Sequence, residues 1–236
     1  MKCYYDLHIH SVLSPDGDEF MTPNNILNMA MLKNLDFIAI TDHNCLLQLQ
    51  TVKNIETSYD FIFVPGVEVT VKEGFDVLCY FRTFNDAEIF NQFIQGYLTD
   101  TFTHFTPDDQ IITDIYDNPI GTVKKGLLTS TLPYKVLYRQ VKSLDGIALF
   151  AHINRPSKSV LNNYSLDDYL FDGIEIEPQH KTAFLKKYPQ YKQYITLSNS
   201  DSHTLMSISE RIEYLELAEK SIDAFFDYFK GGTKNE

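Results

Sequence analysis

The chain has 236 residues, of which 44% are hydrophobic and 22% charged, so it is sized for one large globular domain or two small ones. No apolar run approaches the roughly 18 residues of a membrane span, and the first residues already read as a strand, so neither a span nor a signal peptide is expected. The formal net charge of −12 argues against long nucleic acid as a partner. The widely separated Cys3, Cys45 and Cys79 argue against a disulfide scaffold and favour a reducing cytoplasm.

The first predicted strand, over residues 4–9, ends at two histidines. His8 and His10 are two residues apart, and alternate residues of a strand face the same side. Two imidazoles on one face are a ready pair of metal ligands.

An alternation of helices and strands follows. Thr22 and Pro23 suit the N-cap and first position of a helix that ends near 33–34. A second helix is expected over 47–58. The strands predicted in this half cover 36–40, 61–64 and 76–81.

The pattern changes between about residues 85 and 142. We expect a helix over 86–97, a hairpin formed by 110–113 and 120–123, and a helix over 133–141. The apolar content of this stretch is too small for a core of its own. It is therefore interpreted as an insertion within a single domain that covers residues 1–236.

Alternation resumes with strands predicted over 146–150, 173–176 and 194–197, followed by an extended segment over 211–217 and a closing helix over 221–229. Repeated β-α units with reactive residues at strand ends are typical of a parallel α/β barrel or an open sheet. The barrel is favoured because residues from at least five strands must converge, and no glycine-rich nucleotide-binding motif is present.

The candidate metal ligands lie at or just after the ends of the predicted strands, or in the first loop. Histidines and carboxylates in such number and order indicate a metal centre. They are His8, His10, Asp16, His43, Glu68, Asp76, His152, Asp201 and His203.

The motifs DLHIHS, ITDHN, PGVE, AHINRPS and NSDSH resemble, in order and spacing, those of the PHP (polymerase and histidinol phosphatase) family. The resemblance is closest to stand-alone bacterial members, in which SP-x-GD follows the first motif. It implies a distorted (β/α)7 barrel with an inserted helix and hairpin segment. It also implies two or three divalent ions, Zn²⁺, Mn²⁺ or Fe²⁺, and hydrolysis of phosphoesters.

The same resemblance assigns ligands by position. Asp76 stands where many relatives have histidine, and a carboxylate there would favour Mn²⁺ or Fe²⁺ over Zn²⁺. Asp18 is the alternative to Asp16 if the register of the first loop is shifted. The implied sets are His8, His10, Glu68 and Asp201 for the first ion; Glu68, Asp76 and His152 for the second; and Asp16, His43 and His203 for the third.

Two further residues are expected to act on the substrate. Arg155 follows His152 by three positions, and its guanidinium suits a bidentate phosphate clamp. His180 is a candidate for substrate contact or for proton donation to the leaving group. Asp42 is expected to orient ligands without binding metal itself.

The sequence thus predicts a metal-dependent phosphoesterase that acts on a small phosphorylated substrate, either a phosphomonoester or a short nucleotide. One alternative is a 3′–5′ exonuclease, against which stand the net charge of −12 and the lack of a polymerase domain. Another is a non-catalytic metal-binding or regulatory module, for which Asp76 is the only support.

Overall fold

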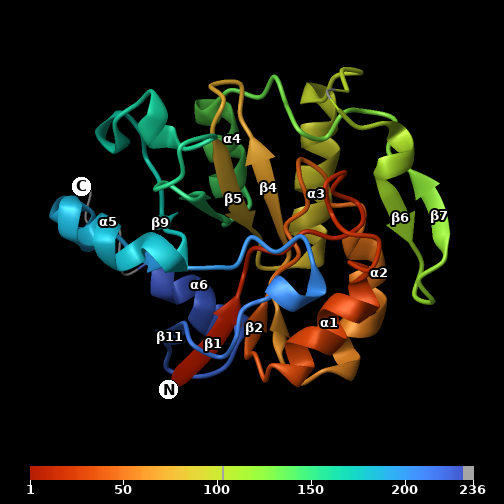
Figure 1. The fold of residues 1–236 in the computed structure, drawn as a ribbon, viewed down its shortest axis with the longest axis horizontal. Coiled ribbons are helices and arrows are strands. Elements are labelled where there is room, and N and C mark those ends of the chain that lie inside the picture. Colours follow the sequence, from red (N-terminus) through yellow and green to blue (C-terminus); the bar gives the residue numbers. More distant parts are fainter. Residues whose placement is uncertain (103, 231–236) are drawn as a thin grey trace.

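The computed structural model describes residues 1–102 and 104–230, and residues 231–236 of the predicted domain lie outside this part (Figure 1). The strands are short, and several have only two or three residues. They are β1 (Lys2–Asp6), β2 (Phe37–Ile38), β3 (Ile62–Phe63), β4 (Gly66–Thr70), β5 (Asp76–Tyr80), β6 (Ile111–Thr113), β7 (Pro119–Thr122), β8 (Ile147–Phe150), β9 (Gly173–Glu175), β10 (Thr196–Leu197) and β11 (Tyr214–Glu216).

The helices lie around these strands, with α1 and α2 on one side of the molecule and α5 on the other (Figure 1). The Thr22 side chain accepts a hydrogen bond from the Asn25 backbone amide and Pro23 begins α1, as the sequence predicts. The helices are α1 (Pro23–Leu32), α2 (Leu49–Ile55), α3 (Phe84–Ile94), α4 (Tyr134–Ser143), α5 (Lys181–Lys187) and α6 (Ile222–Lys230). In the described part of the chain, no helix has the length and apolar character needed to cross a bilayer.

Two main sheets carry the fold, with strand orders β11-β1-β2-β3 and β10-β9-β8-β5-β4, and β6 pairs with β7 as a separate hairpin. Two single parallel bridges join the sheets. Ile9–Ser202 lies beyond the ends of β1 and β10, and His43–Glu68 joins the segment after β2 to β4, so the bridges lie at the two opposite outer strands of the five-stranded sheet. The α/β class is therefore confirmed. The described strands nevertheless form two sheets and not one continuous barrel, because β2 and β10 each end after two paired residues.

Strand β5 departs from the parallel arrangement expected from the sequence. It runs antiparallel to both β4 and β8. Residues 71–75 connect β4 to β5 through a tight turn in which Gly74 has φ of 89°, and this connection is too short for the crossover that parallel strands need. The reversal brings Asp76, the first residue of β5, to the edge at which β4 and β8 end.

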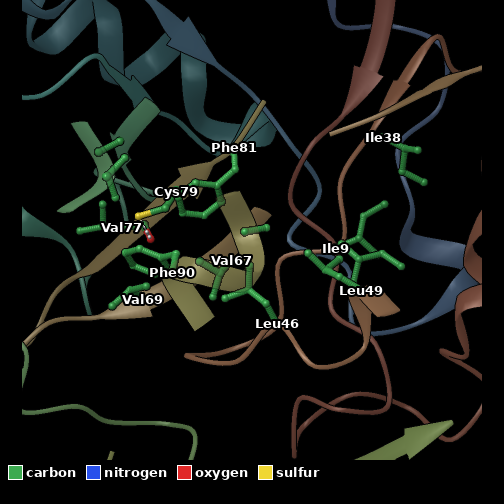
Figure 2. Packing of buried hydrophobic residues seen from close by; sticks show 14 of the residues in the cluster. Ile9, Ile38, Leu46, Leu49, Val67, Val69, Val77, Cys79, Phe81 and Phe90 are labelled. Atoms are coloured by element: carbon green, nitrogen blue, oxygen red, sulfur yellow. Dashed lines mark hydrogen bonds between the residues drawn. The ribbon is translucent and has the colours of Figure 1, made fainter. Parts of the chain in front are cut away.

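Alternate residues of the strands pack in two hydrophobic clusters. On β5, Val77 and Cys79 pack in a cluster with Phe90 of α3, which Figure 2 shows at close range. Leu78 and Tyr80 belong to the other cluster, which combines residues of both sheets with the phenylalanines of α6. The two-residue period of the strands thus places one cluster between the sheets and the other beneath the surrounding helices.

The segment predicted as an insertion packs against the rest of the chain in two places. Phe90 of α3 and Leu137 of α4 lie in the large hydrophobic cluster. The β6–β7 hairpin is held by a buried glutamine, because Gln48 Nε2 donates to the Thr113 carbonyl at 3.1 Å and its Oε1 accepts from the Thr113 amide at 3.1 Å. This segment therefore shares its buried contacts with the sheets.

Candidate metal centre

The candidate ligands converge on the two bridges that join the sheets. His8 and His10 follow β1, and the bridge between His43 and Glu68 brings the end of β2 against β4. Glu68 is within 3.5 Å of imidazole nitrogens from four different histidines, and its side chain is buried. The residues brought together are His8, His10, Asp16, His43, Glu68, Asp76, His152, Asp201 and His203.

Three groups of ligand atoms lie within this cluster, each with its atoms within 4.8 Å of one another, and two of the groups share His10. Glu68 lies between two of them, since its Oε1 is 3.3 Å from His8 Nε2 and 3.0 Å from His152 Nε2. A carboxylate that bridges two ions would occupy this place. The groups are His8, His10 and Asp201; Glu68, Asp76 and His152; and His10, His43 and His203.

The first loop places Asp16, and not Asp18, against this cluster. Asp16 Oδ2 is 3.5 Å from His43 Nε2 and 3.4 Å from His203 Nε2. The carboxylate of Asp18 instead accepts a hydrogen bond from the Phe20 amide at 2.9 Å, within its own turn. Of the two alternatives left open by the sequence, the geometry favours Asp16.

A buried carboxylate that the sequence did not single out holds His8 in place. Glu175 of β9 accepts a hydrogen bond from His8 Nδ1 at 3.0 Å, from Asn199 Nδ2 at 2.7 Å and from the His152 amide at 2.9 Å. Since the carboxylate can only accept, Nδ1 of His8 carries hydrogen and Nε2 faces the cluster. The signal in the sequence is a glutamate within the otherwise apolar start of a predicted strand, Gly173–Glu175.

A second outer contact orients His10. Ser14 Oγ donates to Asp42 Oδ1 at 2.8 Å and lies 2.9 Å from His10 Nδ1, from which it accepts. Asp42 also accepts from the amide and hydroxyl of Ser11, both at 2.7 Å. Asp42 therefore acts on the cluster through Ser14 and does not contact it directly, which is the place that the sequence interpretation gave it.

The residues fit a divalent cation. The outer contacts of His8 and His10 direct both Nε2 atoms inward, where they lie only 3.1 Å apart. Asp201 Oδ1 lies 3.2 and 3.1 Å from these two nitrogens and is a buried oxygen with no hydrogen-bond partner. Lone pairs of three ligand atoms thus face one another, and a cation between them would satisfy all three.

The pKa values of the buried groups in this cluster depend on the charged side chains that lie next to them. Burial lowers the pKa of His8, but the carboxylates around it outweigh burial and raise that pKa well above its usual value; they are Asp201, Glu175 and Glu68. Burial raises the pKa of Asp201, but the imidazoles of His8 and His10 reverse this effect and hold its pKa below the usual range. Protonated imidazoles therefore offset the negative charge of the buried carboxylates. A bound cation would otherwise offset that charge.

Two cluster residues have an unusual backbone conformation. His152 has φ of 30° and Asp201 has φ of 51°, both in the left-handed region that favours glycine. His152 lies two residues after the end of β8, and Asp201 lies four residues after the end of β10. The left-handed conformation turns the chain at these points while the side chain still reaches the cluster.

Two cationic side chains border the cluster. Arg155 Nη2 is 2.8 Å from Asp201 Oδ2 and 2.7 Å from Glu177 Oε1. Lys158 Nζ is 3.6 Å from Asp76 Oδ2, a neighbour that the sequence interpretation missed. His180 is exposed and lines a cavity next to Arg155, without an observed contact to the cluster.

No known family model matches the sequence. An uncharacterised protein of Methanocaldococcus jannaschii, MJ1587, is 35% identical over 77 residues, which are 29% of this chain and 45% of that protein. Endonuclease Q, in a complex with a 27-mer duplex that carries an abasic lesion, superposes with a TM-score of 0.69 at 19% identity, over 99% of this chain and 58% of that one.

Two further solved structures are similar. An amidohydrolase of Chromobacterium violaceum with bound sulfate has a TM-score of 0.64 at 17% identity, and 96% of this chain covers 97% of that one. A two-domain protein of Bacteroides vulgatus with a predicted PHP-like metal-dependent phosphoesterase has a TM-score of 0.57 at 15% identity, over 97% and 62% of the two chains.

The chain has a PHP-like fold. The resemblance read from the motifs is thereby confirmed at the level of the fold. The chain spans little more than half of Endonuclease Q and less than half of the curated relative. This likeness in fold therefore does not assign the activities of those whole proteins to the chain.

One sequence expectation is wrong. The net charge of −12 was taken to argue against long nucleic acid as a partner, yet Endonuclease Q, 58% of which this chain covers, is solved in a complex with a 27-mer duplex. Net charge is a sum over the whole surface, whereas a polyanion meets a local potential. Arg155 and Lys158 contribute positive charge at the border of the cluster, and cations held by the cluster would add to it.

Proposed function

We propose that the chain is a metal-dependent hydrolase of phosphoester bonds. The observation that carries the proposal is the inward-facing set of imidazoles and carboxylates around Glu68, joined from two sheets and fixed by buried outer contacts. Two or three divalent ions, drawn from Mn²⁺, Fe²⁺ and Zn²⁺, suit this mixture of nitrogen and oxygen ligands. When bound, such ions lower the pKa of a water and offset the negative charge of a phosphoryl group.

The other residues of the site would position the substrate. Arg155 is anchored on Asp201 and Glu177, so its guanidinium is fixed at the edge of the cluster, where it can hold phosphoryl oxygens. Lys158 offers a second positive charge on the side of Asp76. His180 lies farther out, on the wall of the adjoining cavity, and is proposed to contact the rest of the substrate.

We propose a phosphodiester bond in nucleic acid as the first substrate class to test. The fold that Endonuclease Q uses with a duplex supports it, as do the cations that border the centre. Phosphomonoesters and short nucleotides serve as comparators in the same panel.

The domain organisation proposed here is a single unit over residues 1–236, with residues 85–142 as its insertion. The two bridges that link the sheets support a distorted (β/α)7 barrel as its underlying plan. The shared buried contacts of α3, α4 and the β6–β7 hairpin support the insertion.

The test combines metal content with activity. Elemental analysis of protein purified without added metal should find at least two equivalents of divalent transition metal, lost in His8→Ala and Asp201→Ala. The metal-loaded parent should then hydrolyse members of a phosphoester panel that includes single- and double-stranded oligonucleotides. Asp18→Asn is the matched control, because this carboxylate serves only its own turn, and it should retain metal and activity.

A parent protein that bound little metal even after reconstitution would overturn the metal centre. If the parent protein bound metal but hydrolysed no phosphoester, the chain would be interpreted as a non-catalytic metal-binding module.

A further inference from the structure

A cavity of about 640 Å³ adjoins the metal centre, and apart from Arg155 and His180 its lining has no role in the site described above. This volume falls within the roughly 300–1,000 Å³ of ligand pockets. One wall comes from residues 153–165, directly after His152, and the other from residues 180–191 of α5 and the 3₁₀ turn Pro189–Gln193. Both segments lie on the α5 side of the molecule (Figure 1).

Arg155 connects the cavity to the centre. It lines the cavity, and its Nη2 is 2.8 Å from Asp201 Oδ2, whose partner oxygen Oδ1 faces His8 and His10. A phosphate held at the centre would therefore have the group attached to it at the mouth of this cavity.

The lining has the chemistry of a site for a planar ring. Four aromatic rings take part, those of Tyr164, Phe184, Tyr188 and Tyr191. The rings of Phe184 and Tyr191 are 5.6 Å apart and nearly parallel, and Tyr188 packs 5.1 Å from Phe184. Aromatic side chains of this kind stack on nucleobases with little regard to sequence.

The charge of the lining is opposite to that of the chain as a whole. Arg155 and Lys187 line the cavity together with His180, whereas no aspartate or glutamate is among the lining residues. The chain carries 32 acidic residues against 20 basic ones, so a wall with cations and without carboxylates is a local exception. Such a wall suits an occupant that combines an aromatic ring with anionic phosphate.

We propose that this cavity binds the nucleobase attached to the phosphate that the metal centre holds. The chain would then recognise a nucleotide whose base is unstacked from its neighbours and packed among the tyrosines. This inference rests on the proposed function for the position of the phosphate. The base can belong to a free nucleotide or to a nucleotide within a strand, and the experiment below separates the two.

The test measures binding to the full, metal-loaded chain by calorimetry. The probes are the methylenephosphonate analogue of dAMP and the same analogue of deoxyribose 5-phosphate, which lacks the base. Neither contains a phosphoester, so turnover cannot obscure binding. We expect the base to strengthen binding by at least about tenfold, within the range for base–aromatic stacking. Tyr164→Ala should remove most of this preference, and Tyr164→Phe should keep it.

Controls separate the cavity from the fold and from catalysis. Tyr116→Ala removes a tyrosine that is 76% exposed near the β6–β7 hairpin and should leave the preference unchanged. Tyr191→Ala, on the opposite wall, repeats the test independently of Tyr164. Chelation of the metal should weaken both probes and leave their ratio intact, so the readout does not depend on hydrolysis.

A third probe, a six-residue single-stranded phosphorothioate oligonucleotide, identifies the source of the base. Tyr164-dependent binding tighter than that of the dAMP analogue would assign the cavity to a base within a strand, and weaker binding would assign it to a free nucleotide. Equal affinity of the two small probes, or a preference that survives both Tyr164→Ala and Tyr191→Ala, would overturn the inference even if phosphoesters are hydrolysed. A preference without hydrolysis would overturn only the proposed function.

Discussion

The metal centre and the aromatic cavity are neighbours, but they differ in burial and in the kinds of residue that form them. The centre is buried except at Asp16, His203 and Asp201, and it is made of charged or ionisable groups from both sheets, whose ligand atoms lie within 4.8 Å of one another in each candidate group. The cavity is open to solvent and made of rings and cations from two short segments of the chain. The centre therefore depends on the whole fold and on balanced charge, whereas the cavity depends on local packing. Substitutions in the two regions should accordingly differ in kind as well as in size.

The largest effect is expected for Glu68→Gln. This carboxylate faces His8, His10, His43 and His152, so an amide there removes the negative charge shared by all of them. We expect a loss of metal affinity and activity greater than the roughly 10- to 100-fold that follows from removing an outer partner. Elemental analysis and kcat/KM measure it, with the exposed Glu19→Gln as control. Retained metal and activity would show that the centre is not organised around Glu68.

The metal-free chain should lose stability as the pH rises from 6.5 to 8. Burial lowers the pKa of His43, but the adjacent carboxylates of Asp16 and Glu68, 3.5 and 2.9 Å from its ring nitrogens, outweigh it and raise the pKa to about 10. The unfolded chain releases this proton near pH 6.5 and the folded chain keeps it, so the stabilisation is complete below pH 6.5 and declines above it, by up to roughly 1.4 kcal/mol per pH unit.

Urea unfolding of chelator-treated protein at both pH values measures this change. His43→Gln should reduce the dependence without abolishing it, since the glutamine does not titrate but the pKa of His8 is raised as well. Added metal should flatten it as well, because it replaces the protons. A stability that stayed constant or rose over this range in the metal-free parent would contradict the charge balance described for the centre.

Glu175→Gln should have an intermediate effect. The substitution keeps the size of the side chain but weakens the acceptor for His8 Nδ1, so the imidazole loses its orientation and part of its basicity. Metal affinity should fall by about 10- to 100-fold, measured by competition with a chelator. The side chain of Glu177, two residues along the chain, has its ion pair with Arg155 and none with an imidazole, so Glu177→Gln should leave metal content unchanged. Equal losses in both variants would mean that Glu175 has no specific role.

The smallest effect is expected in the cavity. Phe184→Leu removes one ring while it keeps an apolar side chain on α5. On a nucleotide substrate it should raise KM by up to about tenfold, with kcat and metal content unchanged. A fall in kcat or a loss of metal would show that the cavity and the centre are not separable.

The candidate ligands that the structure brings together could be chosen from the sequence because each one has a local signal. The spacing of His8 and His10 follows the two-residue period of a strand, and Asp201 and His203 repeat that spacing after β10. Asp16 could not be distinguished from Asp18 in this way, since both lie in one turn and only the folded loop shows which carboxylate faces inward. Glu175 was missed because it lies inside the strand predicted over 173–176, whereas the search concerned strand ends; in the structure it is the last residue of β9.

The parts of the fold that depend on long-range geometry were less predictable. The direction of β5 depends on the length of the turn after β4, which the sequence interpretation did not weigh against the overall alternation. The cavity has no motif at all, because Tyr164 and Tyr191 are ordinary aromatic residues until the two segments pack together. Net charge was similarly uninformative about a local surface.

The left-handed backbone at His152 and Asp201 has a consequence for protein engineering. This conformation is free of strain for glycine, whereas other residues pay of order 1–3 kcal/mol to adopt it. Glycine at either position would therefore relax the metal-free backbone while it removes a candidate ligand. A screen that selects only for heat resistance would thus favour inactive variants at residues 152 and 201, and a library intended to keep the metal should hold both positions fixed.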